Sequence, residues 1–267
     1  MLFLRAKMQL IWRFLVSGHS KWSTIKHGKA VTDARRGKLF TKLTREIIVA
    51  ARFGSDIDSN VKLRVAVQKA RDANMPKDNV ERAIKKGSGE DGSQLQMIEA
   101  FYEGYGPGGI AILLETLTDN KNRTSSAIRS TFTKSGGNMA ESGSVMWQFS
   151  QKGIVIVDAQ DDLAEEMALT AIDAGADDFE TYDSTLEIFA SPSNLEEVRR
   201  ALTGISAEIR SSELAMIPQN TIMLDSKTAK QTLRLMDLLE DLDDVQKVYS
   251  NADFPDEALS EYGNESQ

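Results

Sequence analysis

The hydrophobic pattern of the chain changes once, at the polar segment 87–96 (GSGEDGSQLQ). Before this segment, apolar residues recur at helical spacing; after it, short apolar runs alternate with helical stretches. A helix and a half-buried strand need different apolar periods, so the two sides must fold differently. The sequence therefore predicts an α+β multidomain protein, with an all-α N-terminal module followed by two α/β domains.

The helical pattern is clearest in residues 38–52 (KLFTKLTREIIVAAR). One side of this helix is apolar and consists of Leu39, Leu43, Ile47 and Ala50. A second helix is expected from polar caps at 58–60 to about residue 74, and a third from Pro76 to residue 86. These helices belong to a predicted basic helical domain that spans residues 17–92.

Two apolar runs, 97–105 and 109–118, flank a Gly-Pro-Gly-Gly sequence and predict two strands joined by a turn. A helix over 122–135 and a strand over 145–150 should follow. Within 153–212, the order strand, helix, strand, strand, helix, strand is typical of a ferredoxin-like unit.

Residues 213–224 again have a strand pattern, and a helix at 235–242 and a strand at 245–249 follow. These elements are expected to complete the sheet that begins at Met97. The ferredoxin-like domain III (153–212) would then be inserted into an α/β domain II made of 93–152 plus 213–252. Residues 253–267 are expected to form a loose acidic tail.

Residues 1–16 are apolar, with three cations and no acid. The segment is too short and too interrupted for a membrane span, and it lacks a signal-peptide cleavage site. An amphipathic targeting segment is one interpretation. We favour a translated upstream extension, with Val16 as the initiator of the native protein. No membrane partner is expected.

Charge is distributed unevenly along the chain. Residues 17–86 hold 17 Lys and Arg against 7 Asp and Glu, whereas 87–267 hold 12 against 33, although the whole chain has a net charge of −8. A basic module joined to an acidic remainder indicates contact with a polyanion at the basic end. The acidic remainder would repel the same polyanion and orient the molecule on it.

The predicted nucleic-acid contacts lie in the basic module. Lys38, Lys42, Arg45 and Arg52 fall in one narrow arc of the 38–52 helix, opposite the apolar side. The patch is extended by Lys21, Lys26, Lys29, Arg35 and Arg36, with His27 as a further contact. Trp22 offers an indole for base stacking, and it is equally compatible with packing under the helices.

No pattern predicts catalysis or a bound metal. The chain has no cysteine, and its two histidines are eight residues apart. The G-x-G-x-x-G at Gly87, Gly89 and Gly92 follows a helix and contains acids, so it indicates a linker. The acidic cluster Glu240, Asp241, Asp243 and Asp244 matches no calcium loop and is expected to be a solvated face. We therefore expect no enzymatic activity, no cofactor and no metal.

A second candidate for partner contact is the turn between the first two strands. It consists of Tyr105, Gly106, Pro107, Gly108 and Gly109 and lacks the Gly-Lys-Ser/Thr of a phosphate-binding loop. An exposed tip of this kind is a common place for partner contacts. The absence of cysteine is typical of a reducing compartment, and a cytoplasmic location is expected.

Three long motifs closely resemble the YebC family: GHSKWSTIKHGKAVTDARRGKLFTKLTREI, AVQKARDANMPKDNVERAIKKG and YEGYGPGGIAILLETLTDNKNRT. The resemblance extends from about Ser17 to Phe254. It implies a helical domain and two α/β domains, the third inserted into the second. It also implies nucleic-acid binding in the control of gene expression, with no enzymatic activity and no required cofactor.

Two nucleic-acid-binding functions remain open at this point, besides a purely structural protein–protein adaptor that would leave the basic patch unused. The first is a DNA-binding transcriptional regulator, in which the basic face holds the phosphates of duplex DNA. The alternative is a ribosome-associated translation factor, in which the same face docks on ribosomal RNA and the acidic domains face ribosomal proteins. The sequence specifies neither the target sequence nor the oligomeric state.

Overall fold

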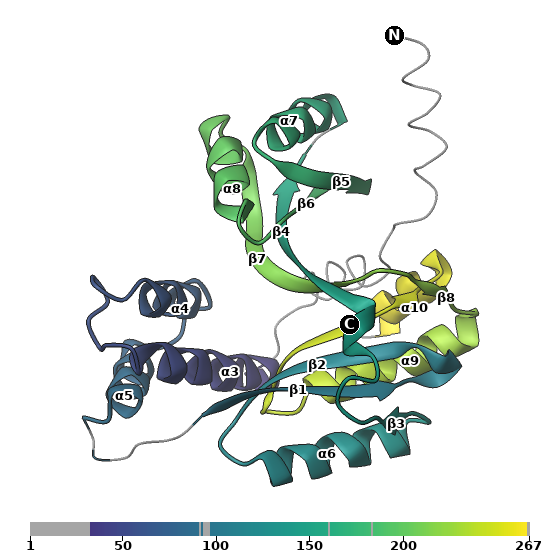
Figure 1. The fold of residues 1–267 in the computed structure, drawn as a ribbon, viewed down its shortest axis with the longest axis horizontal. Helices are drawn as coiled ribbons and strands as arrows, with labels where there is room; N and C mark the ends of the chain where they lie inside the picture. The colour runs from purple at the N-terminus through teal and green to yellow at the C-terminus, as the bar shows by residue number, and fades with distance from the viewer. Residues whose placement is uncertain (1–32, 91, 93–96, 160, 183, 266–267) are drawn as a thin grey trace. The chain divides into compact units, whose positions relative to one another are not determined.

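The computed structural model describes residues 33–90, 92, 97–159, 161–182 and 184–265 (Figure 1). These residues belong to two compact units. One unit contains residues 147–221. The other contains the helical N-terminal module and an α/β part formed by residues 97–146 and 222–265.

The helical module consists of α3 (Asp33–Ala51), α4 (Val61–Asp72) and α5 (Lys77–Ser88). Asn60 caps α4 by accepting a hydrogen bond from the Leu63 backbone N–H, and its amide nitrogen donates to the carbonyl of Ala50. Apolar side chains of all three helices form one core, which includes Ile47, Leu63, Val67, Val80 and Ala83. The prediction of an all-α module is confirmed for residues 33–90.

Close packing of α3 against α5 depends on Gly87. A Cβ atom at this position would lie 2.4 Å from the carbonyl oxygen of Ile48 and 2.7 Å from the Cβ of Ala51. Only a residue without a side chain permits that approach. One predicted core position is wrong: Leu39 is 39% exposed and lies outside the buried core of the module.

The α/β part is built on a four-stranded sheet with the order β3-β1-β2-β9. Its strands are β1 (Ile98–Tyr105), β2 (Ala111–Thr118), β3 (Asn138–Met139) and β9 (Val245–Ser250), with antiparallel pairs throughout. Helices α6 (Lys121–Lys134) and α9 (Ser226–Glu240) pack against it (Figure 1). Because β9 pairs with β2, the chain returns to this sheet after the insertion, as predicted.

The C-terminal segment is not loose. A short parallel pair, β8 (Ile222–Met223) and β10 (Ala252–Asp253), precedes α10 (Asp256–Glu265). Ala258, Leu259 and Tyr262 of α10 are buried in the same core as α9. The prediction of a loose acidic tail is therefore wrong, because three apolar residues at helical spacing anchor the segment.

The second unit has the order β5-β6-β4-β7, and each neighbouring pair is antiparallel. Along the chain its elements are β4 (Phe149–Asp158), α7 (Asp161–Asp173), β5 (Ala176–Tyr182), β6 (Thr185–Ala190), α8 (Leu195–Gly204) and β7 (Glu208–Pro218). Val155, Ile188, Val198 and Leu202 lie in its core. This connectivity confirms the inserted ferredoxin-like domain.

Two strand predictions need correction. Met146–Gln148 forms the 3₁₀ turn η2, and the strand expected over 145–150 instead starts at Phe149 and continues unbroken to Asp158. Residues 213–218 belong to β7 and pair with β4, so they extend the inserted sheet and not the sheet of β1 and β2. Long antiparallel pairing between β4 and β7 accounts for both differences.

Candidate nucleic-acid interface

Several predicted contact residues lie outside the described part of the chain, namely Lys21, Trp22, Lys26, His27 and Lys29. Arg35 lies within α3, but its side chain is also outside the described set. Arg36 is exposed near the start of α3. The four cations of the predicted arc, by contrast, are described in full.

The arc of α3 faces acceptors of the same chain. Lys38 Nζ lies 2.9 Å from a carboxylate oxygen of Asp241, and Arg45 forms an ion pair with Asp244. Arg52 donates to the carbonyl of Met97 at 2.8 Å. Three of the four cations that were predicted to contact phosphates therefore make contacts within the chain.

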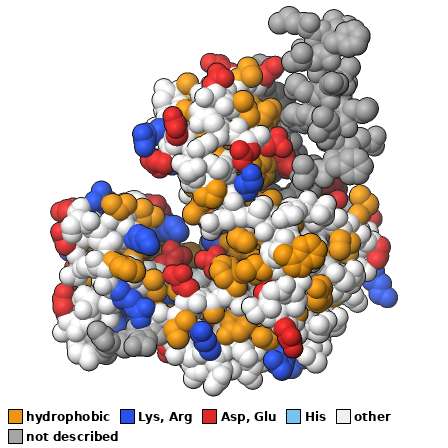
Figure 2. Space-filling model, viewed as in Figure 1, with side chains coloured by type: hydrophobic (Ala, Val, Ile, Leu, Met, Phe, Trp, Pro, Cys, Tyr) orange, Lys and Arg blue, Asp and Glu red, His pale blue; other side chains and the backbone are white. Residues whose placement is uncertain are grey.

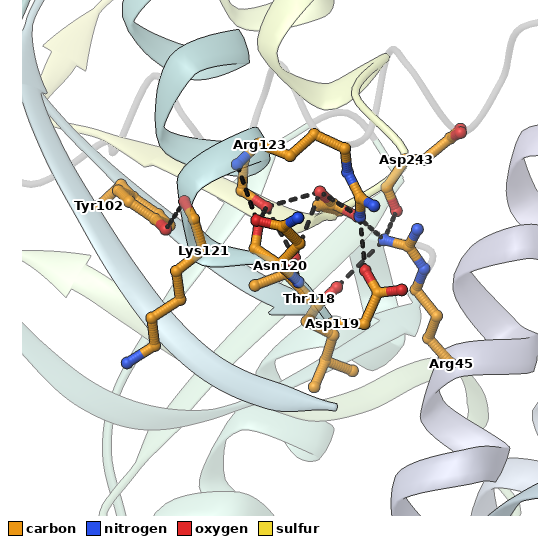
Figure 3. A network of polar contacts seen from close by, with 11 residues as sticks. Arg45, Tyr102, Thr118, Asp119, Asn120, Lys121, Arg123 and Asp243 are labelled. Atoms are coloured by element: carbon orange, nitrogen blue, oxygen red, sulfur yellow. Dashed lines mark hydrogen bonds and ion pairs between the residues drawn. The ribbon is translucent and has the colours of Figure 1, made fainter. Parts of the chain in front are cut away.

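Figure 3 shows a network of polar contacts that includes Arg45, Thr118 and Arg123, and the carboxylate of Asp244 joins these three residues. Only 7% of Asp244 is exposed. Its carboxylate accepts hydrogen bonds from the Arg45 and Arg123 guanidinium groups and from the Thr124 hydroxyl. Arg45 also donates to the carbonyl of Leu117 at 3.0 Å, which joins α3 to the end of β2. The network therefore connects the helical module to the sheet.

Electrostatics favour the ionised form of Asp244. Burial by itself would raise the pKa of this carboxyl, but the Thr124 hydroxyl and the Arg45 guanidinium outweigh burial and lower the pKa. The acidic cluster was predicted to be a solvated face. That prediction is wrong for Asp244, which is buried and paired, and Asp241 forms an ion pair with Lys38.

An open cleft of about 450 Å³ lies beside this network. Its charged lining consists of Arg45, Arg123, Asp119, Asp243 and Asp244. Three carboxylates against two guanidinium groups would repel a phosphate more than attract it. The cleft is therefore unsuited to polyanion binding.

Lys42 is half-buried within the arc. Burial lowers the pKa of its ammonium group to about 8, while the nearby carboxylate of Asp241 acts in the opposite direction. A cation that loses hydration in this way is a poor phosphate ligand compared with an exposed one.

Four exposed cations lie on α4, and α5 exposes three more, which are Lys77, Arg82 and Lys85. We define the α4 surface by seven exposed residues, which are Phe53 from the segment before the helix and Val61, Lys62, Arg64, Val65, Lys69 and Arg71 from the helix. The helix also exposes Gln68 and the acidic Asp72. Basic and hydrophobic side chains are interspersed over the helical module in Figure 2. The signal for this surface was present in the sequence, because Val61 and Val65 are one turn apart and cations flank both.

Two of the α4 cations also make contacts within the module. Lys69 Nζ lies 3.2 Å from a carboxylate oxygen of Glu46, and Arg64 donates to the backbone carbonyls of Ile57 and Asp58. All these side chains keep substantial exposure to solvent. Exposed ion pairs are weak, so they exchange readily for contacts with a stronger polyanion.

The turn between β1 and β2 is partly packed. Gly108 has φ +77°, and a Cβ there would lie 2.8 Å from the Leu224 side chain. Tyr105 donates its hydroxyl to the Ser144 carbonyl at 3.2 Å. Gly106 is buried, whereas Gly108 and Gly109 are exposed. Only the tip of the turn is accessible to a partner, and its contact role stays a prediction.

None of the helices in the described ranges combines the length and apolar character that a membrane span requires. Among the same residues, no group of three or more His, Asp or Glu side chains is arranged to hold a metal ion.

Together, the fold defines a multidomain α+β protein in which a cationic helical module precedes two α/β domains. Residues 20–90 match the model of the TACO1/YebC protein N-terminal domain, and residues 97–252 match that of the TACO1/YebC second and third domain. The chain belongs to the TACO1/YebC family, which confirms the resemblance found in its motifs.

Relatives with known sequences agree over nearly the whole chain. A protein of Dehalococcoides mccartyi is 50% identical over 253 residues, and one of Halothermothrix orenii is 51% identical over 255 residues. Each match covers 94% of this chain and 100% of the relative, and both relatives are named "Probable transcriptional regulatory protein".

A similar solved structure is the crystal structure of a conserved hypothetical protein from Aquifex aeolicus. It is 43% identical, with a TM-score of 0.75, and the match covers 84% of this chain and 93% of that one.

Proposed function

We propose that this protein is a non-enzymatic regulator of gene expression that binds nucleic acid through the α4 surface, with duplex DNA as its first target class. One observation carries the proposal: the α4 surface presents four exposed cations, whereas Lys42 of the α3 arc is half-buried and Arg45 forms a largely buried ion pair with Asp244. The names of the relatives, which describe transcriptional regulators, support the same direction.

Phosphate binding follows from the arrangement of these cations. At about 100° per residue, Lys62 and Lys69 lie on one side of Val61 and Val65, and Arg64 and Arg71 on the other. Two rows of cations along one helix can contact phosphates on both sides of a groove and release the condensed counterions. Such contacts position the protein without reading the sequence.

The alternative target is the ribosome. Residues 87–267 hold 33 acidic against 12 basic residues, so most of the protein would be repelled by duplex DNA. Basic ribosomal proteins would attract the same residues while the α4 surface contacts ribosomal RNA. This charge distribution favours a ribosome-associated translation factor as the second candidate.

Charge reversal tests the assigned surface. In the double variant Lys62→Glu with Arg71→Glu, the slope of log affinity for duplex DNA against log salt should decrease by about 2, since each lost phosphate contact removes about 0.9. The control is Lys121→Glu with Lys134→Glu, which changes the net charge equally at exposed positions of α6. Equal slopes for both double variants would remove the α4 surface from the proposal.

A competition measurement distinguishes the two targets. The protein is bound to purified ribosomes at near-physiological salt, and duplex DNA is added. If excess DNA leaves the protein on ribosomes, the translation factor is supported. If one promoter fragment displaces it better than a scrambled fragment, the transcriptional regulator is supported. Binding to neither target would contradict the proposal.

A further inference from the structure

An exposed aromatic ring lies at the edge of the α4 surface. Phe53 lies two residues after the end of α3, and 73% of its surface is accessible, although large aromatic side chains are usually buried. Val61 and Val65, which follow on α4, are 65% and 53% exposed. Exposing three apolar side chains in one small region is unfavourable in water unless a ligand covers them.

The backbone around Phe53 is held in place. Its N–H donates to the Ala50 carbonyl at 3.3 Å, and the next residue, Gly54, has φ +136°, a conformation that favours glycine. The buried amide of Asn60 donates to the carbonyls of Ala50 and Gly54, both at 2.8 Å. The ring is therefore presented from a fixed turn, which limits the entropy lost on binding.

A cation already lies over the ring. Lys62 Nζ is 5.3 Å from the ring centroid of Phe53, within the range of a cation–π contact. Lys62, Val65 and Lys69 fall within about 60° of one another on the helix. The ring thus shares one surface with two ammonium groups, so a ligand that is both flat and anionic would match it.

We propose that Phe53 is a base-stacking site, so that the α4 surface, besides the duplex contacts made by its cations, also binds nucleic acid with unpaired bases. The inference rests on the proposed nucleic-acid binding and specifies its substrate class. An unpaired base stacks on the phenyl ring, and the adjoining phosphates contact Lys62 and Lys69. In a regular duplex the base faces are covered by their neighbours, so a ring of this kind contributes little there.

Charge distinguishes this ligand from a protein partner. Protein–protein interfaces are depleted of Lys at their core, and an apolar protein surface would have to desolvate Lys62 beside Phe53. A phosphate chain compensates both ammonium groups, and a base covers the ring. The combination of ring and cations is the one found in proteins that bind single strands.

The test measures three ligands of equal length: an oligo-uridine RNA, an oligo-thymidine DNA and a DNA duplex. The substitution Phe53→Leu keeps the apolar volume and removes the aromatic face. Binding to both single strands should weaken about 5- to 150-fold, the range expected for one stacked base, while duplex binding should change less than about twofold. Phe53→Trp should retain single-strand binding, and its added fluorescence should be quenched on binding.

Leu169→Ala is the matched control, because it removes an apolar side chain that is 60% exposed on α7. It should change none of the three affinities. Equal single-strand and duplex losses in Phe53→Leu, or no loss, would overturn the stacking site and leave the proposed function intact. If the parent protein bound the duplex but neither single strand, the stacking site would also be overturned and the proposed function would stand. Parent protein that binds none of the three ligands would overturn both.

Discussion

The buried carboxylate of Asp244 connects α3 to α6. Its carboxylate contacts Arg45 of α3, Arg123 and Thr124 of α6, and it lies on the loop between α9 and β9. A buried carboxylate without partners is strongly unfavourable, so each donor is needed to retain the charge. The pair of Arg45 and Asp244 is therefore structural.

Removal of Arg45 should destabilise the protein markedly. In Arg45→Ala the free energy of unfolding should decrease by about 2–3 kcal/mol, somewhat less than for breaking an isolated buried pair, because Arg123 and Thr124 remain. The comparison variant is Lys38→Ala, whose pair with Asp241 is exposed and should contribute less than about 1 kcal/mol. Urea unfolding followed by circular dichroism measures both. Equal losses would contradict the structural assignment of Arg45.

At the scale of elements, the packing of α3 against α5 was not visible in the helical pattern. The pattern identified both helices and the apolar side of the first, of which Leu43, Ile47 and Ala50 are buried. It could not show that Gly87 marks the closest approach, since a glycine near a helix end usually indicates a C-terminus. Only the neighbouring Ile48 carbonyl reveals the role of this residue.

Two glycine-to-alanine substitutions should therefore change the free energy of unfolding in opposite directions. Gly87→Ala places a methyl group against the α3 backbone and should destabilise the protein by about 1–3 kcal/mol. Gly37→Ala lies within α3, where no atom of the described residues is within 4 Å of its added Cβ, and it should stabilise the protein by up to about 1 kcal/mol. Thermal unfolding measures both values. A destabilised Gly37→Ala, or a neutral Gly87→Ala, would show that the helices are packed differently.

At the scale of the whole molecule, the basic and acidic parts of the chain are partly paired with each other. The charge count predicted a basic module for a polyanion and an acidic remainder. Lys42 lies near charges of both parts. Burial is the main cause of its lowered pKa, and Lys38 lowers the pKa further. The carboxylates of Asp241 and Asp243 raise it. The titration of Lys42 therefore reports on the charges of segments about 200 residues apart.

The lowered pKa of Lys42 should be visible in the pH dependence of the free energy of unfolding. The folded pKa of Lys42, about 8, is below the unfolded value of 10.5, so the unfolded chain binds more protons between these two values. Stability should rise with pH in that window, with a slope of up to about 1.4 kcal/mol per pH unit from this group. Lys42→Met should be more stable at pH 7 and lack that component of the slope. Parallel pH profiles for parent and variant would contradict the pKa of Lys42.

The sequence by itself determined the elements that depend on local pattern. These are the three helices of the N-terminal module, the ferredoxin-like order of the insertion, and the return of the chain to the first sheet. Each depends on apolar period and turn residues, which act over a few positions. The family resemblance was also determined there, because its motifs are continuous in sequence.

Only the tertiary structure decided what the polar sides of these elements face. Arg45 and Asp244 are 199 positions apart, so no local pattern could pair them, and each was assigned separately to solvent or to a partner. Because α3 contacts the acidic loop through Lys38 and Arg45, four of the cations that stay exposed, together with the ring of Phe53, lie on the α4 surface. Periodicity identifies which side of a helix is polar. What that side contacts depends on which residues the fold places opposite it.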